Sequence, residues 1–372
     1  MTALPMRRRV HLQRAGNAMT TDHATADDLE YPFPKPPAPG QVVQVAPGVL
    51  AIRLSLPFRL DHVNLYLIED DSGYALVDTG LATDCSRAEW EMLLAGPLSG
   101  IRLTRVIVSH SHPDHIGLAG WLCRRFEVDL LTSQTTWLTC QHISLSPGAL
   151  DTLPYRSIFK RHGLDGPTTD IVVTQGHRYL AMVEELPPTF TRIVAGDALR
   201  IGGRDFQVLS GDGHAAEQVM LYCAADRLFL AADQVLAKIT PNVSVWAADP
   251  DGDPLALYLR SLAALRSQVA EDVLVLPGHQ LPFYGLHRRC DALHAHHEHR
   301  CQLIEQACAS EPHSVAELVP VLFPRQLDPH QLGFAFSEAH AHVNYLIGQK
   351  RLYWAESKDG RKRAILRDGS AS

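Results

Sequence analysis

The 372-residue sequence contains no uninterrupted apolar run of about 18 residues, the length that a membrane-spanning helix needs. Its seven cysteines are scattered and form no C-x-x-C pair, so we expect buried or free thiols in a reducing compartment, the cytoplasm. Arg7, Arg8 and Arg9 stand near the start of the chain, but no apolar stretch of signal-peptide length follows them. We therefore expect neither a membrane span nor a secreted disulfide framework.

The chain also lacks a glycine-rich phosphate loop and a broad lysine and arginine patch. Its net charge is −7, which gives no general attraction to nucleic acid. With 46 % hydrophobic residues, the chain can build one large domain or two ordinary ones. A small-molecule substrate is therefore the expected partner, and a homodimer remains an option.

Residues 106–117 read VIVSHSHPDHIG and carry most of the chemical signal. A short apolar run, typical of a buried strand, is followed by His110 and His112, which alternate and could bind one cation together. Pro113 ends the extended segment, so a loop should direct Asp114 and His115 toward a second cation. Imidazole nitrogen and carboxylate oxygen suit zinc, iron, manganese or cobalt. A polar turn with solvated histidines is a poor explanation for three histidines and an aspartate within six residues.

The H-x-H-x-D-H string resembles the signature of the metallo-β-lactamase-fold hydrolases. Four further segments resemble the rest of that family's metal-binding pattern and occur in its order. They are GYALVDTG with Asp78, SGDGHAAEQ with His214, LFLAADQVL with Asp233 and VLVLPGHQ with His279.

The resemblance implies an α+β fold, the αββα metallo-β-lactamase sandwich, here with a small, mainly helical C-terminal subdomain. It also implies two divalent metal ions, with zinc favoured over iron or manganese. The first ion would be held by His110, His112 and His214, the second by Asp114, His115 and His279, with Asp233 bridging both. Asp114 would also be the catalytic residue that orients the metal-bridging hydroxide and passes on its proton. Asp78 would orient a metal-binding imidazole through a hydrogen bond.

Ala215 stands where a threonine or serine commonly follows the third histidine of this family. The run HAAEQ is more similar to the glyoxalase II and lactonase branch, which favours hydrolysis of a small ester, thioester or lactone. A phosphodiesterase or nuclease acting on nucleic acid is the alternative, suggested by a winged-helix-like tail. An oxygen-binding redox protein on the same scaffold is a third reading, disfavoured because the chain has no added flavin-binding domain.

The expected organisation is a flexible tail and proline-rich spacer over residues 1–40, a hydrolase domain over 41–300, and the C-terminal subdomain over 301–372. Met19 is an alternative start. Residues 133–195 are an insertion that could form the substrate wall or only cover apolar surface. Helices over 314–322 and 329–347 precede a hairpin over 350–367, whose basic tip, Arg361 to Arg363, is expected to be solvated.

A few residues outside the motifs carry weaker expectations. Asp84 is placed to cap a helix over 84–95. A helix over 285–309 is rich in histidine; His294 and His297 fit a solvated face, whereas His287 follows His279 closely enough to reach the cleft. Asn242 could line the site or make a turn, and Asp212 fits a turn slightly better than a role in orienting a ligand.

Overall fold

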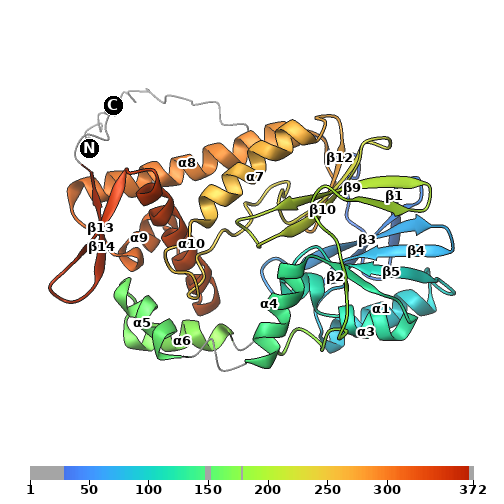
Figure 1. Cartoon of the computed structure of the whole chain (residues 1–372), viewed down its shortest axis with the longest axis horizontal. Coiled ribbons are helices and arrows are strands. Elements are labelled where there is room, and N and C mark those ends of the chain that lie inside the picture. The colour runs from blue at the N-terminus through green and yellow to red at the C-terminus, as the bar shows by residue number, and fades with distance from the viewer. Residues whose placement is uncertain (1–28, 147–151, 177–178, 368–372) are drawn as a thin grey trace, which may run out of the picture.

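The computed structural model describes residues 29–146, 152–176 and 179–367, so most of the expected N-terminal tail lies outside the described residues. Two β-sheets pack face to face, with helices on both outer faces and a helical C-terminal region at one end (Figure 1). The α+β sandwich with a mainly helical C-terminal subdomain is confirmed. No helix in the described ranges is both long and apolar enough to span a bilayer.

The first sheet contains seven strands in sequence order, antiparallel up to the fourth strand and parallel from there on. Its third strand is buried over six consecutive residues, as expected for a strand covered on both faces. The strands are β1 (Val42–Ala46), β2 (Val49–Ser55), β3 (His62–Asp70), β4 (Gly73–Val77), β5 (Leu103–Ile107), β6 (Leu130–Thr132) and β7 (Thr191–Arg192).

The second sheet has five strands in the order β12-β11-β10-β9-β8. Only the β11–β12 pair is parallel, and β10 and β11 are buried throughout. Its strands are β8 (Ala198–Ile201), β9 (Arg204–Gly211), β10 (Gln218–Cys223), β11 (Leu228–Ala232) and β12 (Leu274–Pro277). Apolar side chains from both sheets, among them Ile68, Val77, Phe206 and Leu230, form the core between them.

Helices α1 (Asp84–Ala95) and α3 (Ala119–Phe126) cover the first sheet, and α7 (Pro254–Gln268) and α8 (Leu286–Ser310) cover the second. Thr83, rather than the expected Asp84, caps α1, because its hydroxyl accepts the Ser86 N–H at 3.2 Å. The C-terminal helices are α9 (Val315–Leu322) and α10 (Pro329–Gly348), followed by the hairpin β13 (Leu352–Glu356) and β14 (Lys362–Leu366). Ser314 and Glu317 form a reciprocal capping box at the start of α9.

The insertion contains α4 (Gln134–Leu145), α5 (Leu153–Arg161) and α6 (Gly166–Gly176), and it ends by adding β7 to the first sheet. Helix α6 begins at Gly166 and Pro167, two residue types that are also typical of chain breaks. They can start a helix because proline is tolerated in the first turn. Helix α6 packs on α10, so the insertion contacts the C-terminal region.

The described part of the proline-rich segment contacts the fold from its first residue. Leu29 is buried, and Glu30 forms an isolated β-bridge with Tyr284. The chain is therefore anchored to the second-sheet side of the sandwich before β1 begins.

Candidate metal centre

Strand ends bring the predicted ligands together. The parallel strands β4 and β5 end side by side, followed by Asp78 and by the histidine-rich loop. The parallel strands β11 and β12 end together in the other sheet, followed by Asp233 and His279. His214 lies in the connection between β9 and β10. The carboxyl ends of each parallel pair lie at one edge of their sheet, and the two sheets pack face to face, so residues about 200 positions apart converge.

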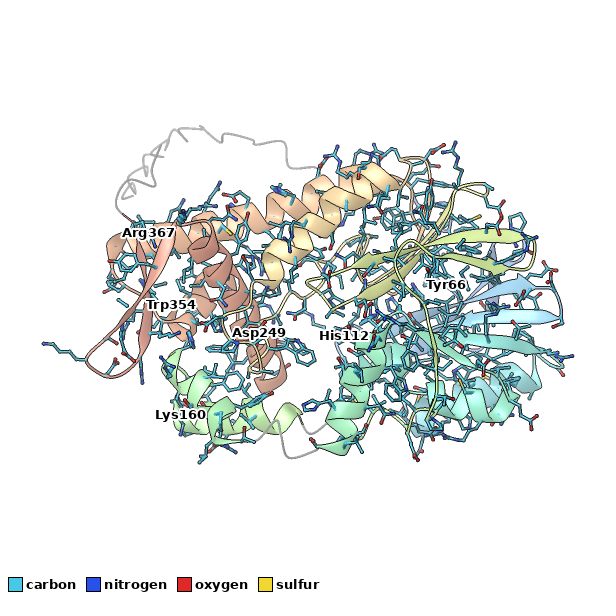
Figure 2. The ribbon with its side chains drawn as sticks, viewed as in Figure 1. Tyr66, His112, Lys160, Asp249, Trp354 and Arg367 are labelled. Carbon is cyan, nitrogen blue, oxygen red and sulfur yellow. The ribbon has the colours of Figure 1, made fainter. Side chains whose placement is uncertain are left out.

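The loop expected after Pro113 contains one turn of helix, α2 (Pro113–Ile116). His112 has extended backbone angles at the start of this turn, and its carbonyl accepts the His115 N–H at 3.0 Å. The reversal separates the extended His110–His112 segment from Asp114 and His115, as the two-cation interpretation requires. Figure 2 shows His112 on the side of the sandwich that faces the C-terminal helices.

Four of the histidines share one hydrogen-bond arrangement, in which Nδ1 lies against an oxygen atom. These pairs are His110 with Ser109 Oγ (2.9 Å), His115 with Asp78 Oδ2 (2.8 Å), His214 with the Asn242 carbonyl (2.8 Å) and His279 with the His62 carbonyl (2.7 Å). Carbonyl and carboxylate oxygens only accept, so Nδ1 donates in the last three pairs. Ser109 already donates its hydroxyl hydrogen to Asp78 Oδ2 at 2.9 Å, so His110 Nδ1 donates as well. In the neutral form of each ring, Nε2 therefore keeps a free lone pair.

The Nε2 atoms of His115, His214 and His279 face carboxylate oxygens, which are also acceptors. Asp233 Oδ2 lies 3.5 Å from His214 Nε2, 3.5 Å from His115 Nε2 and 3.1 Å from His279 Nε2. The His115 Nε2, His214 Nε2 and Asp233 Oδ1 atoms are buried and have no hydrogen-bond partner. Acceptors gathered this closely need cations between them, either protons or metal ions.

The spacing of the donor atoms fits metal ions. Two donors about 2.0–2.2 Å from one tetrahedral zinc ion lie roughly 3.4 Å apart. His110 Nε2 and His112 Nδ1 are 2.9 Å apart, and His279 Nε2 and Asp114 Oδ2 are 3.4 Å apart. The ligand atoms of His110, His112 and His214 lie within 4.8 Å of one another, as do those of Asp114, His115 and His279. Histidine nitrogen and carboxylate oxygen are a donor set suited to zinc, iron or manganese.

Burial and neighbouring charges divide the imidazoles into two kinds. Burial lowers the pKa of His110 well below its ordinary value and, together with nearby His214, lowers the pKa of His112 to about 3. Burial also opposes charge on His115, but Asp233, Asp114 and Asp78 outweigh it and raise the pKa of His115 well above its ordinary value. The His112 side is therefore ready to bind a cation as neutral imidazole, while the His115 side holds a proton that a metal ion must displace.

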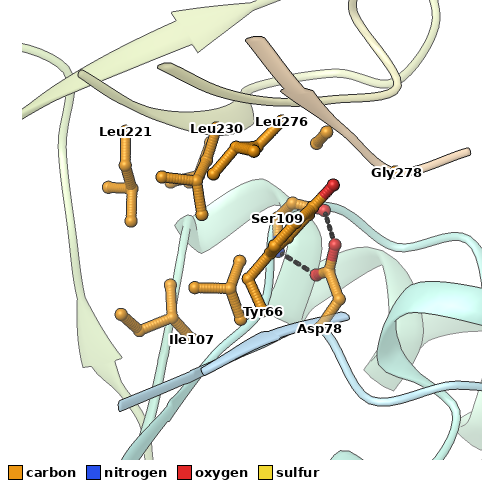
Figure 3. A pocket seen from close by; sticks show the side chains of 11 residues that line it. Tyr66, Asp78, Ile107, Ser109, Leu221, Leu230, Leu276 and Gly278 are labelled. Carbon is orange, nitrogen blue, oxygen red and sulfur yellow. Dashed lines mark hydrogen bonds between the residues drawn. The ribbon is translucent and has the colours of Figure 1, made fainter. Parts of the chain in front are cut away.

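Asp78 and Asp114 occupy different environments. Asp78 is buried and accepts the Ser109 N–H at 2.8 Å and the Ser109 hydroxyl, in addition to His115. Figure 3 shows this pair beside a narrow cavity between the two sheets, whose apolar lining includes Leu230 and Leu276. The Asp114 side chain is 19 % exposed, against 7 % for Asp233, so it is the cluster's carboxylate nearest to solvent.

Comparisons with known proteins bear on this arrangement. The family model of the metallo-beta-lactamase superfamily matches residues 58–279, and that of the metallo-beta-lactamase-like C-terminal domain matches residues 301–364. The chain belongs to the metallo-β-lactamase superfamily. As a superfamily hydrolase with clustered histidines and aspartates, it has residues that fit a metal site.

Members of this superfamily resemble the chain over most of its length. A β-lactamase domain protein from Burkholderia ambifaria is 38 % identical, with a TM-score of 0.83 over 92 % of this chain and 98 % of that one. A metallo-β-lactamase family protein from Thermus thermophilus is 28 % identical, with a TM-score of 0.74 over 87 % of this chain and all of that one. "Probable metallo-hydrolase YqjP" from Bacillus subtilis is 24 % identical over 82 % of this chain and 95 % of its own length. The assignment to the glyoxalase II and lactonase branch stays a prediction.

Two histidine expectations outside the superfamily motif were wrong. His287 turns away from the metal centre, with Nε2 2.8 Å from the Val269 carbonyl and Nδ1 3.2 Å from Glu271. His297 is fully buried rather than solvated, and its Nδ1 lies 3.1 Å from His342 Nε2. His294 is exposed, as expected.

Two contacts near the centre escaped sequence analysis, those of Tyr179 and of the Asn242 carbonyl, whereas the turn expected at Asp212 is present. Tyr179, from the insertion, donates to the Ser111 carbonyl at 2.7 Å and so holds the loop between two ligands. Asn242 supplies the carbonyl that orients His214, and its side chain contacts Glu338 of α10 at 3.3 Å. Asp212 takes the turn role, accepting the Glu217 N–H at 2.9 Å. No pattern in the sequence signals backbone acceptors of this kind.

Proposed function

We propose that the chain is a dinuclear metal-dependent hydrolase that acts on a small ester, thioester or lactone. The residues that would hold the first ion are His110, His112 and His214, and those for the second are Asp114, His115 and His279. Two bound ions would supply a water of lowered pKa and a Lewis acid for the substrate's carbonyl oxygen. Zinc is the ion we favour, because its four-coordinate sites use these donor types.

One observation carries this proposal. A single oxygen, Asp233 Oδ2, lies within 3.5 Å of His214 Nε2 from the first ligand group and of His115 and His279 Nε2 from the second. One carboxylate atom placed between two imidazole groups fits a bridging ligand. A mononuclear site would leave one group of converging lone pairs with protons as their only cations.

We assign proton handling to Asp114. Its carboxylate is partly exposed and lies 3.4 Å from His279 Nε2. It can accept a proton from the attacking water and release it toward solvent. Asp233 is nearly closed to solvent and is surrounded by imidazoles, so it is a poor route for a proton.

Charges in the C-terminal hairpin favour a small substrate over nucleic acid. Lys362 Nζ lies 3.6 Å from Asp251, Arg363 pairs with Glu317 at 2.6 Å, and Arg361 lies 3.6 Å from Asp359. Each basic group of the tip therefore has a carboxylate neighbour, which lowers its attraction for phosphates.

The test is metal analysis combined with a hydrolysis screen. Protein loaded with zinc, iron or manganese would be assayed on acyl thioesters, lactones, aryl esters and bis-nitrophenyl phosphate. We expect close to two ions per chain and turnover of a carbonyl substrate. Turnover of the phosphodiester alone would move the assignment to the alternative. One ion per chain at saturating metal would overturn the dinuclear claim.

Location and assembly are further parts of the proposal. All seven cysteines are free, and only Cys85 is exposed. This supports a reducing compartment, and we propose the cytoplasm. A homodimer is compatible with these features and is tested by the mass of the protein in solution.

A further inference from the structure

We infer that Glu338, in the C-terminal subdomain, is a positioning residue for the metal ligand His214 and acts through Asn242. The inference rests on the proposed metal centre and concerns the ion held by His110, His112 and His214. It assigns the C-terminal helices a part in metal binding, although they contribute none of the predicted ligands.

His214 differs from the other three histidines in what its Nδ1 atom contacts. The acceptors for His110, His115 and His279 are Ser109, Asp78 and His62, which lie in or beside the strands of the first sheet. The acceptor for His214 is the Asn242 carbonyl, in loop 234–245, the segment that follows Asp233. The orientation of His214 therefore depends on what fixes this loop.

Helix α10 fixes the part of the loop that contacts His214. The Asn242 side-chain amide donates to Glu338 Oε2 at 3.3 Å, and the Val245 N–H donates to the Ser337 carbonyl at 3.1 Å. Ser244 Oγ donates to Asn242 Oδ1 and so sets which end of the Asn242 amide faces Glu338. These contacts join positions about 95 residues apart in the chain.

Helix α8 completes the attachment. Arg300 Nη1 donates to Glu338 Oε1, so the carboxylate is held between Arg300 and Asn242. Nearer the start of the same helix, Arg289 donates to the Leu236 carbonyl at 2.6 Å and to the Ile239 carbonyl at 2.8 Å. One end of loop 234–245 is thus bound to α8 and the other to α10.

Burying the Glu338 carboxylate costs free energy, so its presence at this position is poorly explained unless the side chain has a role there. The residue is 7 % exposed, and an ionised carboxylate in such a place destabilises the fold unless it is paired. Arg300 supplies the pairing charge and itself lies over the Phe323 ring at 4.6 Å. An apolar residue would pack here more simply, but it would leave the Asn242 amide without its acceptor.

His297, Glu338 and His342 also offer ligand atoms within 4.8 Å of one another, which raises the alternative of a separate metal site. Existing bonds use most of these atoms. Both Glu338 oxygens are engaged, His342 Nδ1 donates to the Glu338 carbonyl at 2.8 Å, and His297 Nδ1 donates to His342 Nε2. The pair of histidines therefore supports the backbone at Glu338.

The experiment compares Glu338→Ala, Asn242→Ala and Glu338→Gln with the unaltered protein. Asn242→Ala keeps the carbonyl that contacts His214 but removes the side-chain link, so it should behave like Glu338→Ala. Crystals would be equilibrated with buffered free zinc, and the occupancy of each position would be read from anomalous diffraction. Arg351→Ala is the matched control, because Arg351 pairs with Glu298 and Glu305 in the same subdomain without contacting loop 234–245.

We expect both alanine variants to weaken the ion held by His214 by about 10–100-fold, the usual effect of removing a group that orients a ligand. The second ion should change little, Glu338→Gln should be intermediate, and Arg351→Ala should leave both ions unchanged. Equal weakening of both ions, or none, would overturn the inference, as would a zinc ion bound by Glu338. An unaltered protein that holds one ion would instead overturn the proposed dinuclear function.

Discussion

In each histidine, the acceptor that contacts one ring nitrogen determines that the other nitrogen is free to bind a metal. His115 illustrates the point: Asp78 Oδ2 accepts its Nδ1 hydrogen, so Nε2 is left free to bind a cation. A ring that lost this acceptor could carry its hydrogen on Nε2 and would then be unable to bind a metal. The residues that select the correct tautomer should therefore matter nearly as much as the ligands themselves.

Asp78→Asn tests this dependence. Asparagine tolerates the positive φ of 63° found at Asp78, so the backbone should be kept. Its amide NH₂ would replace one acceptor oxygen, however, and would face a donor from either Ser109 or His115. We expect the affinity for the second metal to fall by about 10–100-fold, with kcat partly restored by excess metal. Unchanged affinity in a metal-competition titration would contradict this explanation.

Asp114→Asn should give a different pattern. The change keeps one oxygen that can contact a metal but removes the negative charge and the base. The ion held by three histidines should stay, while kcat should fall by about 10²–10⁴-fold even with excess metal. The measurement is kcat and metal content side by side with Asp78→Asn. Near-normal kcat in Asp114→Asn would assign proton handling to another group.

Gly278 shows how closely the backbone approaches the site. A Cβ atom at this position would lie 2.3 Å from Asp233 Oδ1 and 2.8 Å from His115 Cε1. Gly278→Ala should therefore displace the carboxylate and lower the free energy of unfolding by about 1–3 kcal/mol, the usual cost of overpacking. Bound metal should fall in the same variant. Gly203→Ala is the control, since its Cβ would meet no atom within 4 Å.

At the scale of elements, the sequence predicted strands and helices well where local patterns decide them. The helix over 84–95 and the hairpin at 350–367 lie where expected, because apolar periodicity and turn residues act over a few positions. The convergence of His110, His214 and His279 was predicted only through the resemblance to a family. Helix α6 was missed because a Gly-Pro pair suits both a break and a helix start.

Contacts between distant elements account for what the sequence did not predict. His297 looked like part of a solvated face because its partner, His342, lies 45 positions away on α10. Asn242 and Glu338 lie 96 positions apart. Neither pair follows a period of two or 3.6 residues, so only the packing of α10 on α8 and on loop 234–245 brings the partners together.

The β13–β14 hairpin gives a prediction at the same scale. Changing Arg361, Lys362 and Arg363 together to alanine should leave DNA binding unaltered, because the unaltered protein should bind no duplex at physiological salt. The lost surface ion pairs should cost at most about 1 kcal/mol each in the free energy of unfolding. Fluorescence anisotropy with a labelled duplex is the measurement. Binding that disappears in the triple variant and weakens with salt would contradict it.

At the scale of the whole molecule, one hydrophobic core joins the hydrolase region to the C-terminal region. The cluster that contains Phe229 and Val275 of the second sheet also contains Leu318, Phe336 and Leu352. The two family matches therefore share a core, and a change in the C-terminal helices can reach the metal centre through packing as well as through Glu338. Metal binding should accordingly stabilise the whole chain.

The stabilisation by metal should depend on pH. Burial opposes charge on His115 and His279, but the neighbouring carboxylates, Asp233 above all, raise the pKa of both rings above about 6.5, so each favours a proton in the metal-free protein. That proton stabilises the metal-free fold below about pH 6.5, and the benefit is lost as pH rises through the raised pKa values. A metal ion needs the same nitrogens without their protons, so its apparent affinity should rise with pH by up to about tenfold per pH unit for each proton displaced.

The measurement is the difference in Tm between zinc-loaded and chelator-treated protein from about pH 6 to 8.5, at fixed free zinc. We expect this difference to widen as pH rises, because stabilisation grows with the logarithm of the ratio of free metal to Kd. The ion bound by His110 and His112 should contribute little of this dependence, because the pKa of His112 is already lowered to about 3 by burial and by nearby His214, and that of His110 is also low. Asp78→Asn removes one of the charges that raise the pKa of His115, so it should flatten the dependence. A Tm difference that does not change with pH in the unaltered protein would mean that protons and metal ions do not compete for His115 and His279.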